Sequence, residues 1–244
     1  MGSLSSLVAE SHVVNRSLSS KQISKMVEPG LLSRQELLDN HIIYPELEQD
    51  KVVDTYRELR TKLLQISNGE NRITMISGVA YKSGASHIAL NLAAAFAFDE
   101  SKTALVIDCN IRKPTLNQRL HLEPQFGLTD FLEQETLGLD RIIYASGIPR
   151  LRVIPVGQRR EHSSEYFTSL RMKALLDVLI HRYPDRHIFL DAPPIGESAD
   201  APILTALADQ VVIVIPYGKV QPAQIQSAVD AVDRHKLVGM VVNQ

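Results

Sequence analysis

The sequence predicts a three-layer α/β/α domain around a mostly parallel central sheet. Six short runs rich in β-branched and other apolar residues recur along the chain, at 73–77, 103–108, 151–155, 187–191, 211–215 and 238–242. Helix-length segments lie between most of them, including 86–98, 165–183 and 222–235. Strands that are apolar throughout are buried on both faces, and their alternation with helices favours parallel pairing. Right-handed crossovers then place helices on both faces of the sheet.

The first 48 residues are expected to form a flexible arm with one short helix, ahead of a domain at residues 49–244. Residues 1–28 are rich in serine and contain few large apolar groups, a composition typical of flexible segments. Ser33 and Glu36 have the spacing of a capping box, which predicts the start of the short helix. Beyond residue 50, apolar residues at helical spacing predict an amphipathic helix to about residue 66: Val53, Tyr56, Leu59, Leu63 and Leu64.

Composition excludes several classes of protein. The 244 residues are 44% apolar, enough for a sizeable core, and the net charge of -2 gives no basic field to attract nucleic acid. The single cysteine, Cys109, excludes an intrachain disulfide and a cysteine-based zinc site. The apolar runs are far shorter than the ~20 residues of a membrane span, and no signal-peptide pattern opens the chain. A cytoplasmic protein without a nucleic-acid partner is therefore expected.

A glycine-bearing turn joins the first predicted strand to a helix, and such a helix N-terminus attracts phosphate. Phosphate-binding loops normally read G-x-x-x-x-G-K-[ST], with the lysine on the phosphates and the hydroxyl on Mg²⁺. Here Ala85 stands at the lysine position, and the gap between the two glycines is one residue longer. Lys82 is a candidate substitute, whereas an ordinary strand–loop–helix turn is the alternative. The candidate phosphate-binding residues are Gly78, Lys82, Ser83, Gly84, Ala85, Ser86 and His87.

Polar side chains also follow two other predicted strands. Asp108 ends the second strand, and Asn110 follows it in place of a second carboxylate, so it can ligate a metal but cannot act as a base. Arg112 is placed to meet a phosphate. Asp191 ends a buried strand before two prolines, the usual arrangement of a carboxylate that reaches Mg²⁺ through water. The catalytic candidates are therefore Asp108, Asn110 and Asp191. The candidate Mg²⁺ ligands are Ser86, Asp108 and Asp191. The alternative role for Asp108 is to cap the next turn.

Together these residues resemble the bacterial tyrosine autokinase (BY-kinase) family, P-loop NTPases of exopolysaccharide and capsule biosynthesis. The resemblance covers about residues 50–243. The acid-x-x-Arg-x-x-Arg self-assembly motif of that family is matched by Asp54, Arg57 and Arg60, with Asp for the usual Glu. Further motifs follow in family order: Asn91-Leu-Ala, Arg112-Lys-Pro, Gly127-Leu-Thr-Asp-Phe-Leu132, Pro155-Val-Gly157, Asp191-Ala-Pro-Pro and Gly239-Met-Val-Val-Asn243.

The resemblance implies ATP and Mg²⁺ as cofactors and an adenine contact for Asn243. It also implies homo-oligomers and a membrane-embedded polysaccharide co-polymerase, or chain-length protein, as partner. Through that partner the chain would lie at the inner face of the plasma membrane and regulate polymerisation or chain length.

Three departures separate this sequence from the family pattern: the loop lysine is Ala85, the following Thr is His87, and the second acid is Asn110. The C-terminal tyrosine cluster of the family is also absent. Three interpretations follow. The chain is an active ATP-dependent tyrosine kinase with a rearranged loop, or a catalytically degenerate scaffold or regulator of the same machinery, or a partition-type positioning ATPase. The Arg57 helix and the segment 127–132 favour the first two.

Overall fold

The computed structural model describes residues 23, 26–47, 51–158 and 163–244. A seven-stranded sheet with the order β3-β4-β2-β5-β1-β6-β7 forms its centre, and every neighbouring pair except β3–β4 is parallel. The mostly parallel sheet confirms the predicted fold class. The strands are β1 Ile73–Gly78, β2 Thr103–Asp108, β3 Tyr144–Ala145, β4 Leu151–Ile154, β5 Arg186–Asp191, β6 Gln210–Pro216 and β7 Leu237–Asn243.

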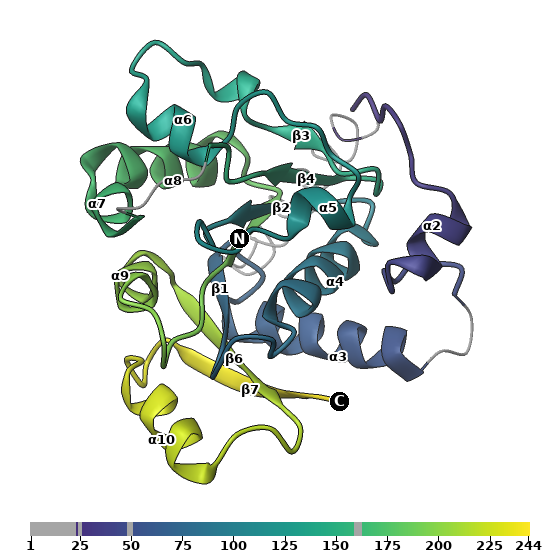
Figure 1. Cartoon of the computed structure of the whole chain (residues 1–244). Helices are drawn as coiled ribbons and strands as arrows, with labels where there is room; N and C mark the ends of the chain where they lie inside the picture. Colours follow the sequence, from purple (N-terminus) through teal and green to yellow (C-terminus); the bar gives the residue numbers. More distant parts are fainter. Residues whose placement is uncertain (1–22, 24–25, 48–50, 159–162) are drawn as a thin grey trace, which may run out of the picture.

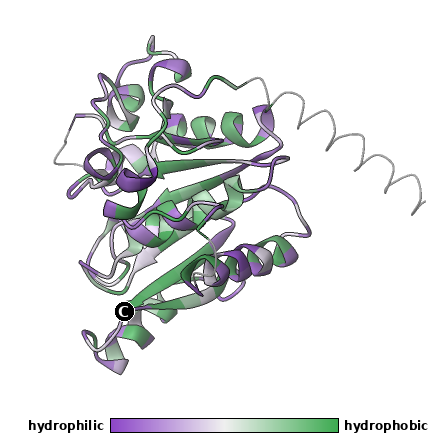
Figure 2. Ribbon diagram, turned by 90° about the vertical axis from the view of Figure 1, so that its right-hand side faces the viewer, coloured by the Kyte–Doolittle hydropathy of each residue, from purple (hydrophilic) through white to green (hydrophobic). Residues whose placement is uncertain are grey.

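Helices cover both faces of this sheet, because side chains along each strand alternate between two cores (Figure 1). Figure 2 shows the hydrophobic strands between the helical layers. One face is covered by α2 Arg34–Asp39, α3 Lys51–Ile66, α4 Ala85–Ala97 and α5 Leu116–Arg119. The other is covered by α6 Leu128–Glu133, α7 Ser163–Thr168, α8 Leu170–Arg182, α9 Asp200–Leu207 and α10 Pro222–Asp230. None of the helices that the structure describes has both the length and the apolar character needed to cross a bilayer.

The six predicted strands are all present, and the differences from prediction are local. The helix expected at 165–183 is divided into α7 and α8, because the hydroxyl of Ser169 caps a new helix by accepting from the backbone N–H of Met172 at 3.1 Å. The helix expected to reach residue 235 ends at Asp230. The two-residue strand β3, antiparallel to β4, is too short to leave a hydrophobic pattern.

The short helix predicted after Ser33 is α2, and its capping box is formed. The backbone N–H of Ser33 donates to Glu36 Oε2 at 2.8 Å, and the Ser33 hydroxyl accepts from the backbone N–H of Glu36 at 3.3 Å. Leu37, Ile42 and Ile43 are buried against α3 and α4. The described part of the predicted arm thus packs on the domain, because these apolar side chains anchor it.

Residues 1–22 of the predicted flexible arm lie outside the described residues, and the domain boundary at residue 48 stays a prediction. Asn91, a fully buried side chain of α4, holds the segment that follows α2. Its Oδ1 accepts from the backbone N–H of Ile43 at 2.8 Å, and its Nδ2 donates to the carbonyl of His41 at 3.1 Å. A buried amide satisfied on both sides fixes this segment beside the phosphate-loop helix.

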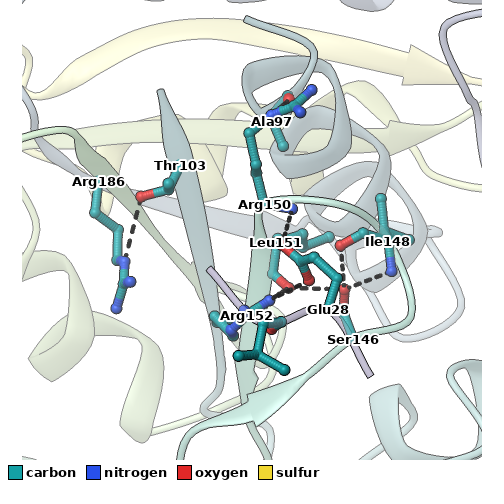
Figure 3. A network of polar contacts seen from close by, with 10 residues as sticks. Glu28, Ala97, Thr103, Ser146, Ile148, Arg150, Leu151, Arg152 and Arg186 are labelled. Carbon is teal, nitrogen blue, oxygen red and sulfur yellow. Dashed lines mark hydrogen bonds and ion pairs between the residues drawn. The ribbon is translucent and has the colours of Figure 1, made fainter. Parts of the chain in front are cut away.

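Glu28 ties the segment that precedes α2 to β4 (Figure 3). Its carboxylate accepts from the backbone N–H of Arg150 and pairs with the guanidinium of Arg152, both at 2.8 Å. The side chain of Arg150 in turn donates to the carbonyl of Ala97 at 2.8 Å, at the C-terminal end of α4. The segment is therefore linked to both β4 and α4.

A second feature, which we call the clasp, joins residues 127–132 to residues 155–158. The hydroxyl of Thr129 donates to the carbonyls of Val156 and Gln158 at 2.9 and 2.7 Å. The backbone of Gly127 passes so close to Gly157 that a Cβ on Gly127 would lie 2.2 Å from its nitrogen. The motif segments at Gly127 and Gly157 therefore form one packed unit.

Candidate functional site

The phosphate loop joins β1 to α4 and is shaped by two glycines. A Cβ on Gly78 would lie 1.9 Å from the hydroxyl of Ser83, so only glycine fits there. Gly84 has φ +86°, in the left-handed region that favours glycine, and is the N-cap residue of α4. The backbone N–H groups at the start of α4, beginning at Ala85, have no carbonyl partner one turn earlier and are free to bind an anion.

Asn243, at the end of the edge strand β7, holds this loop in place. Its Nδ2 donates to the carbonyl of Ser83 at 2.9 Å. A Cβ on Gly84 would lie 2.1 Å from the same amide nitrogen. The side chain that the resemblance assigns to adenine is therefore engaged with the loop itself, and its adenine contact stays a prediction.

Asp108 and Asp191 lie side by side, because β2 and β5 are neighbours and the two residues are paired in register. Both are fully buried. The Asp108 Oδ1 accepts from the backbone N–H of Asn110 at 3.0 Å, whereas its Oδ2 and both oxygens of Asp191 have no partner within hydrogen-bond geometry among the described residues. A buried carboxylate pair in which only Asp108 Oδ1 has a donor forms an incomplete site.

The electrostatics of the pair follow from this burial. Burial and the neighbouring charge of Asp191 raise the pKa of Asp108 well above its usual range. Burial raises the pKa of Asp191 to about 7, and the hydroxyl of Ser86 and the charge of Arg119 lower it. The effect of Ser86 places its hydroxyl next to Asp191, although no full hydrogen bond forms. The three predicted Mg²⁺ ligands, Ser86, Asp108 and Asp191, are thus brought together at the carboxyl ends of the strands.

Further buried oxygens without a partner in the described structure belong to the segment that follows Asp108: Asn110 Oδ1, Thr115 Oγ1 and Asn117 Oδ1. An oxygen-only donor set suits Mg²⁺, which binds through one or two carboxylates and keeps several waters. The described residues contain no group of three His, Cys, Asp or Glu side chains arranged around a metal. The residues present therefore fit Mg²⁺ with few protein ligands, and not a metal held by a closed cage of side chains.

The cations singled out by the sequence lie outside this buried centre. Lys82 is exposed at the tip of the loop with φ +63°, and no partner of its ammonium is found in the described part of the chain. Arg112 is exposed as well. Between them, the ammonium of Lys113 lies 3.8 Å from the ring centroid of Tyr81 in a cation–π contact. The backbone N–H of Tyr81 donates to Glu197 Oε2 at 3.2 Å.

Sequence reasoning did not single out Arg119, which lies at the end of α5. One cavity of about 830 Å³ is lined by Gly84, His87, Arg119 and Asn243, and on its other side by α3 and the segment after α2. Burial and the positive charges of Arg119 and His41 lower the pKa of His87 to about 4, so the imidazole is neutral. No motif surrounds Arg119, so nothing in the sequence distinguishes it from a surface arginine.

The predicted self-assembly residues lie at the other end of α4. Asp54 and Arg57 form an exposed ion pair at 3.2 Å, one turn apart on α3. Arg60 instead turns inward and donates to the carbonyl of Ala95 at 2.8 Å. Within the subunit, Arg60 therefore joins α3 to α4, and these three residues are not brought to the phosphate loop.

Comparison with known proteins decides the family. The chain is 34% identical over 193 residues to the tyrosine-protein kinase YwqD of Bacillus subtilis, covering 78% of this chain and 80% of that protein. It belongs to the bacterial tyrosine-protein kinase family. It is also 26% identical to CpsD of Streptococcus agalactiae over 87% of this chain and 90% of that kinase. The match to the kinase ptk of Acinetobacter johnsonii, at 28% identity, spans only 26% of that longer protein. No family model matches the chain.

Solved structures show the same fold. The kinase domain of the Escherichia coli tyrosine kinase ETK superposes with a TM-score of 0.75 at 22% identity, covering 90% of this chain and 82% of that domain. The chimerical protein CapA2B2 gives 0.74 at 23% identity over 93% and 98%. McdA of Cyanthece gives only 0.57 at 18% identity over 70% and 71%. The P-loop fold is thereby confirmed, and the likeness extends further along the kinase domains than along McdA.

Proposed function

We propose that this chain binds ATP with Mg²⁺ and serves exopolysaccharide or capsule biosynthesis as a tyrosine autokinase-like component. The buried carboxylates Asp108 and Asp191 beside Ser86, of whose oxygens only Asp108 Oδ1 has a donor, carry this proposal. A protein does not keep such a pair for stability, because each desolvated carboxylate costs free energy until a cation neutralises it. The family relationship to named tyrosine kinases supports the same choice of ligand.

Each part of the site has a role in this proposal. The N-terminus of α4 holds the phosphates through its backbone N–H groups, with Gly78 and Gly84 giving them room. Ser86 ligates Mg²⁺ through its hydroxyl, and Asp108 and Asp191 hold the metal directly or through water. Mg²⁺ held by these residues would supply positive charge to neutralise the terminal phosphates.

Phosphoryl transfer by this site is expected to be slow. Ala85 cannot neutralise charge that develops on the transferred group, a loss on the order of several kcal/mol of transition-state stabilisation. Asn110 leaves one carboxylate fewer to act as a base. A nucleotide-responsive scaffold or regulator of polymerisation or chain length is therefore the form of the function that these residues favour over a fast kinase.

Calorimetric titration of the protein with ATP, with Mg²⁺ and with a chelator, tests the proposal. We expect binding that is tighter with Mg²⁺, and we expect Asp191→Asn to remove the Mg²⁺ dependence. Asp177→Asn, at an exposed position on α8, removes the same charge far from the site and should change nothing. Equal ATP affinity with and without Mg²⁺, or no binding at all, would overturn the proposal.

Transfer from labelled ATP to protein tyrosine separates an active kinase from a scaffold. We expect little transfer by the natural chain and more by Ala85→Lys, which restores the missing ammonium. Loss of transfer in Lys82→Ala would instead identify Lys82 as the substitute cation, as the sequence alone suggested. Rapid transfer that neither substitution changes would exclude the scaffold.

We further propose that the chain self-associates through α3 and docks onto a membrane-embedded chain-length protein. The exposed Arg57 is the residue of the motif that remains available to a neighbouring subunit, since Arg60 is engaged with Ala95. Light scattering of Arg57→Ala should show a lower mass than the natural chain, with Lys62→Ala, exposed on the same helix, as control. Unchanged mass contradicts the first part, and failure to co-purify with the membrane protein contradicts the second.

A further inference from the structure

We propose that Arg119 supplies the positive charge that the phosphate loop lacks at Ala85, and binds the terminal phosphates of a nucleoside triphosphate. The inference rests on the proposed nucleotide function and adds to it a residue outside the loop. Arg119 is a different residue from Lys82, the candidate that the sequence suggested. Arg119 lies on α5 and is partly buried, whereas Lys82 lies on the loop and is exposed.

The position of Arg119 in the fold is the first support for this role. Arg119 lies at the last position of α5 and lines the same cavity as Gly84, which precedes Ala85, and His87, in the first turn of α4. Its side chain is partly buried, and its guanidinium forms no hydrogen bond or ion pair with any residue that the structure describes. A desolvated guanidinium without a carboxylate partner is complementary to a phosphate, which it can bind in a bidentate manner.

The position of Arg119 also distinguishes it from the other candidate cations. Arg119 lines the cavity together with Gly84 and His87, at the start of α4. Lys82 and Arg112 are exposed and are not among the residues that line this cavity.

The element that carries Arg119 is tied to the metal side of the site. The backbone N–H groups of Thr115 and Leu116, at the start of α5, point toward the Asp108 carboxylate and lower its pKa. Leu116 is fully buried and anchors the helix in the core. A cation fixed in this way keeps its position relative to Asp108, whereas the exposed Lys82 has a free, flexible stem.

The test compares nucleotides that differ only in phosphate number. Dissociation constants of ATP, ADP and AMP are measured by calorimetry for the natural chain, Arg119→Gln, Arg119→Lys and Lys82→Gln. Arg119→Gln should weaken ATP binding roughly tenfold to hundredfold and leave AMP binding within about twofold, because only the terminal phosphates lose a charge-assisted contact. Arg119→Lys should retain part of the affinity. Lys82→Gln should behave like the natural chain.

Two controls separate a local effect from a structural one. Arg234→Gln removes the same charge at an exposed position before β7 and should leave all three affinities unchanged. Thermal unfolding without ligand should show that Arg119→Gln folds as the natural chain does. A variant that lost ATP and AMP binding alike would have lost the site's structure, and that result would overturn the specific role of Arg119.

Remaining outcomes distinguish this inference from the proposed function. If the natural chain binds ATP and Arg119→Gln binds it equally well, Arg119 is excluded and the proposed function stands. If the natural chain binds inorganic tripolyphosphate but not ATP, and Arg119→Gln loses that binding, the phosphate role stands and the nucleotide function fails. If neither ATP nor tripolyphosphate binds the natural chain, both are overturned.

Discussion

The clasp and the phosphate edge differ in how their buried polar side chains are hydrogen-bonded. In the clasp, the hydroxyl of Thr129 donates to the carbonyls of Val156 and Gln158. Asp130 Oδ2 accepts from the backbone N–H groups of Gly127 and Gln158, although Asp130 Oδ1 has no partner among the described residues. At the phosphate edge, both oxygens of Asp191 and one oxygen of Asp108 have no donor among the described residues. Each of the two clasp side chains therefore forms hydrogen bonds that join the two segments, whereas the Asp191 carboxylate forms none. Substitution in the two regions should therefore change stability with opposite sign.

The largest effect is expected at Gly157 of the clasp. Its φ of +83° strains any other residue, and a Cβ would lie 2.2 Å from Asp130 Oδ2 and 2.8 Å from the nitrogen of Gly127. Gly157→Ala should lower the free energy of unfolding by about 3 kcal/mol or more, measured by urea denaturation. Gly239→Ala is the matched control, since its Cβ meets nothing within 4 Å and its φ is not positive. Similar losses in both variants would contradict the clasp.

A smaller loss of stability is expected when Thr129 is replaced. Thr129→Val keeps the shape of the side chain but removes the donor for the carbonyls of Val156 and Gln158. The Val156 carbonyl keeps the backbone N–H of Thr129 as a donor at 2.9 Å, and Gln158 is exposed, so the variant loses hydrogen bonds without leaving a buried acceptor unpaired. Stability should therefore fall by about 1 kcal/mol. Thr168→Val, at an exposed position on α7, is the control. Equal denaturation midpoints for Thr129→Val and the natural chain would show that these hydrogen bonds contribute nothing.

At the phosphate edge, Asp191→Asn should raise the stability of the ligand-free protein by about 1 kcal/mol, because it removes a desolvated charge beside Asp108. The effect depends on pH. The pKa of Asp191 is about 7 in the folded protein and 3.8 in an ordinary environment, so the folded state binds more protons between these values. Protonated Asp191 therefore favours the folded state. This stabilisation is fully present below pH 4 and is lost as the pH rises through 7.

This direction of the pH dependence can be checked by measuring the denaturation of the natural chain and of Asp191→Asn from pH 4 to pH 8. The difference between the two proteins should grow in favour of Asp191→Asn toward pH 8. A destabilised Asp191→Asn at pH 8 would mean that the carboxylate is satisfied without ligand. The comparison between clasp and phosphate edge would then fail.

Much of the fold is predictable from the sequence because strand and loop signals are local. Runs such as 103–108 are rich in apolar and β-branched residues, so both their existence and their burial follow from composition. The division of the expected helix into α7 and α8 depends on a single capping hydrogen bond at Ser169. Strand β3 depends on its two-residue pairing with β4. Such features depend on tertiary contacts that no periodicity encodes.

The candidate site was only partly predictable. Ser86, Asp108 and Asp191 were placed together because strand ends of a parallel sheet share one edge. Arg119 was missed, since its importance arises from a cavity formed by segments that lie far apart in the sequence. The inward turn of Arg60 to Ala95 was also missed, because a motif predicts which residues recur but not which partner each one meets in this subunit.

The hydrogen bond from Asn243 to Ser83 has a consequence for the order of folding. The two residues are 160 positions apart, so the loop is synthesised long before the side chain that holds it. Closing so large a separation makes this contact one of the late events of folding. A ribosome-bound chain that ends before β7 should carry a loop whose amide protons exchange freely, although β1, β2 and β5 have already emerged. The phosphate loop is therefore completed by the last strand of the described chain and not by its own sequence neighbours.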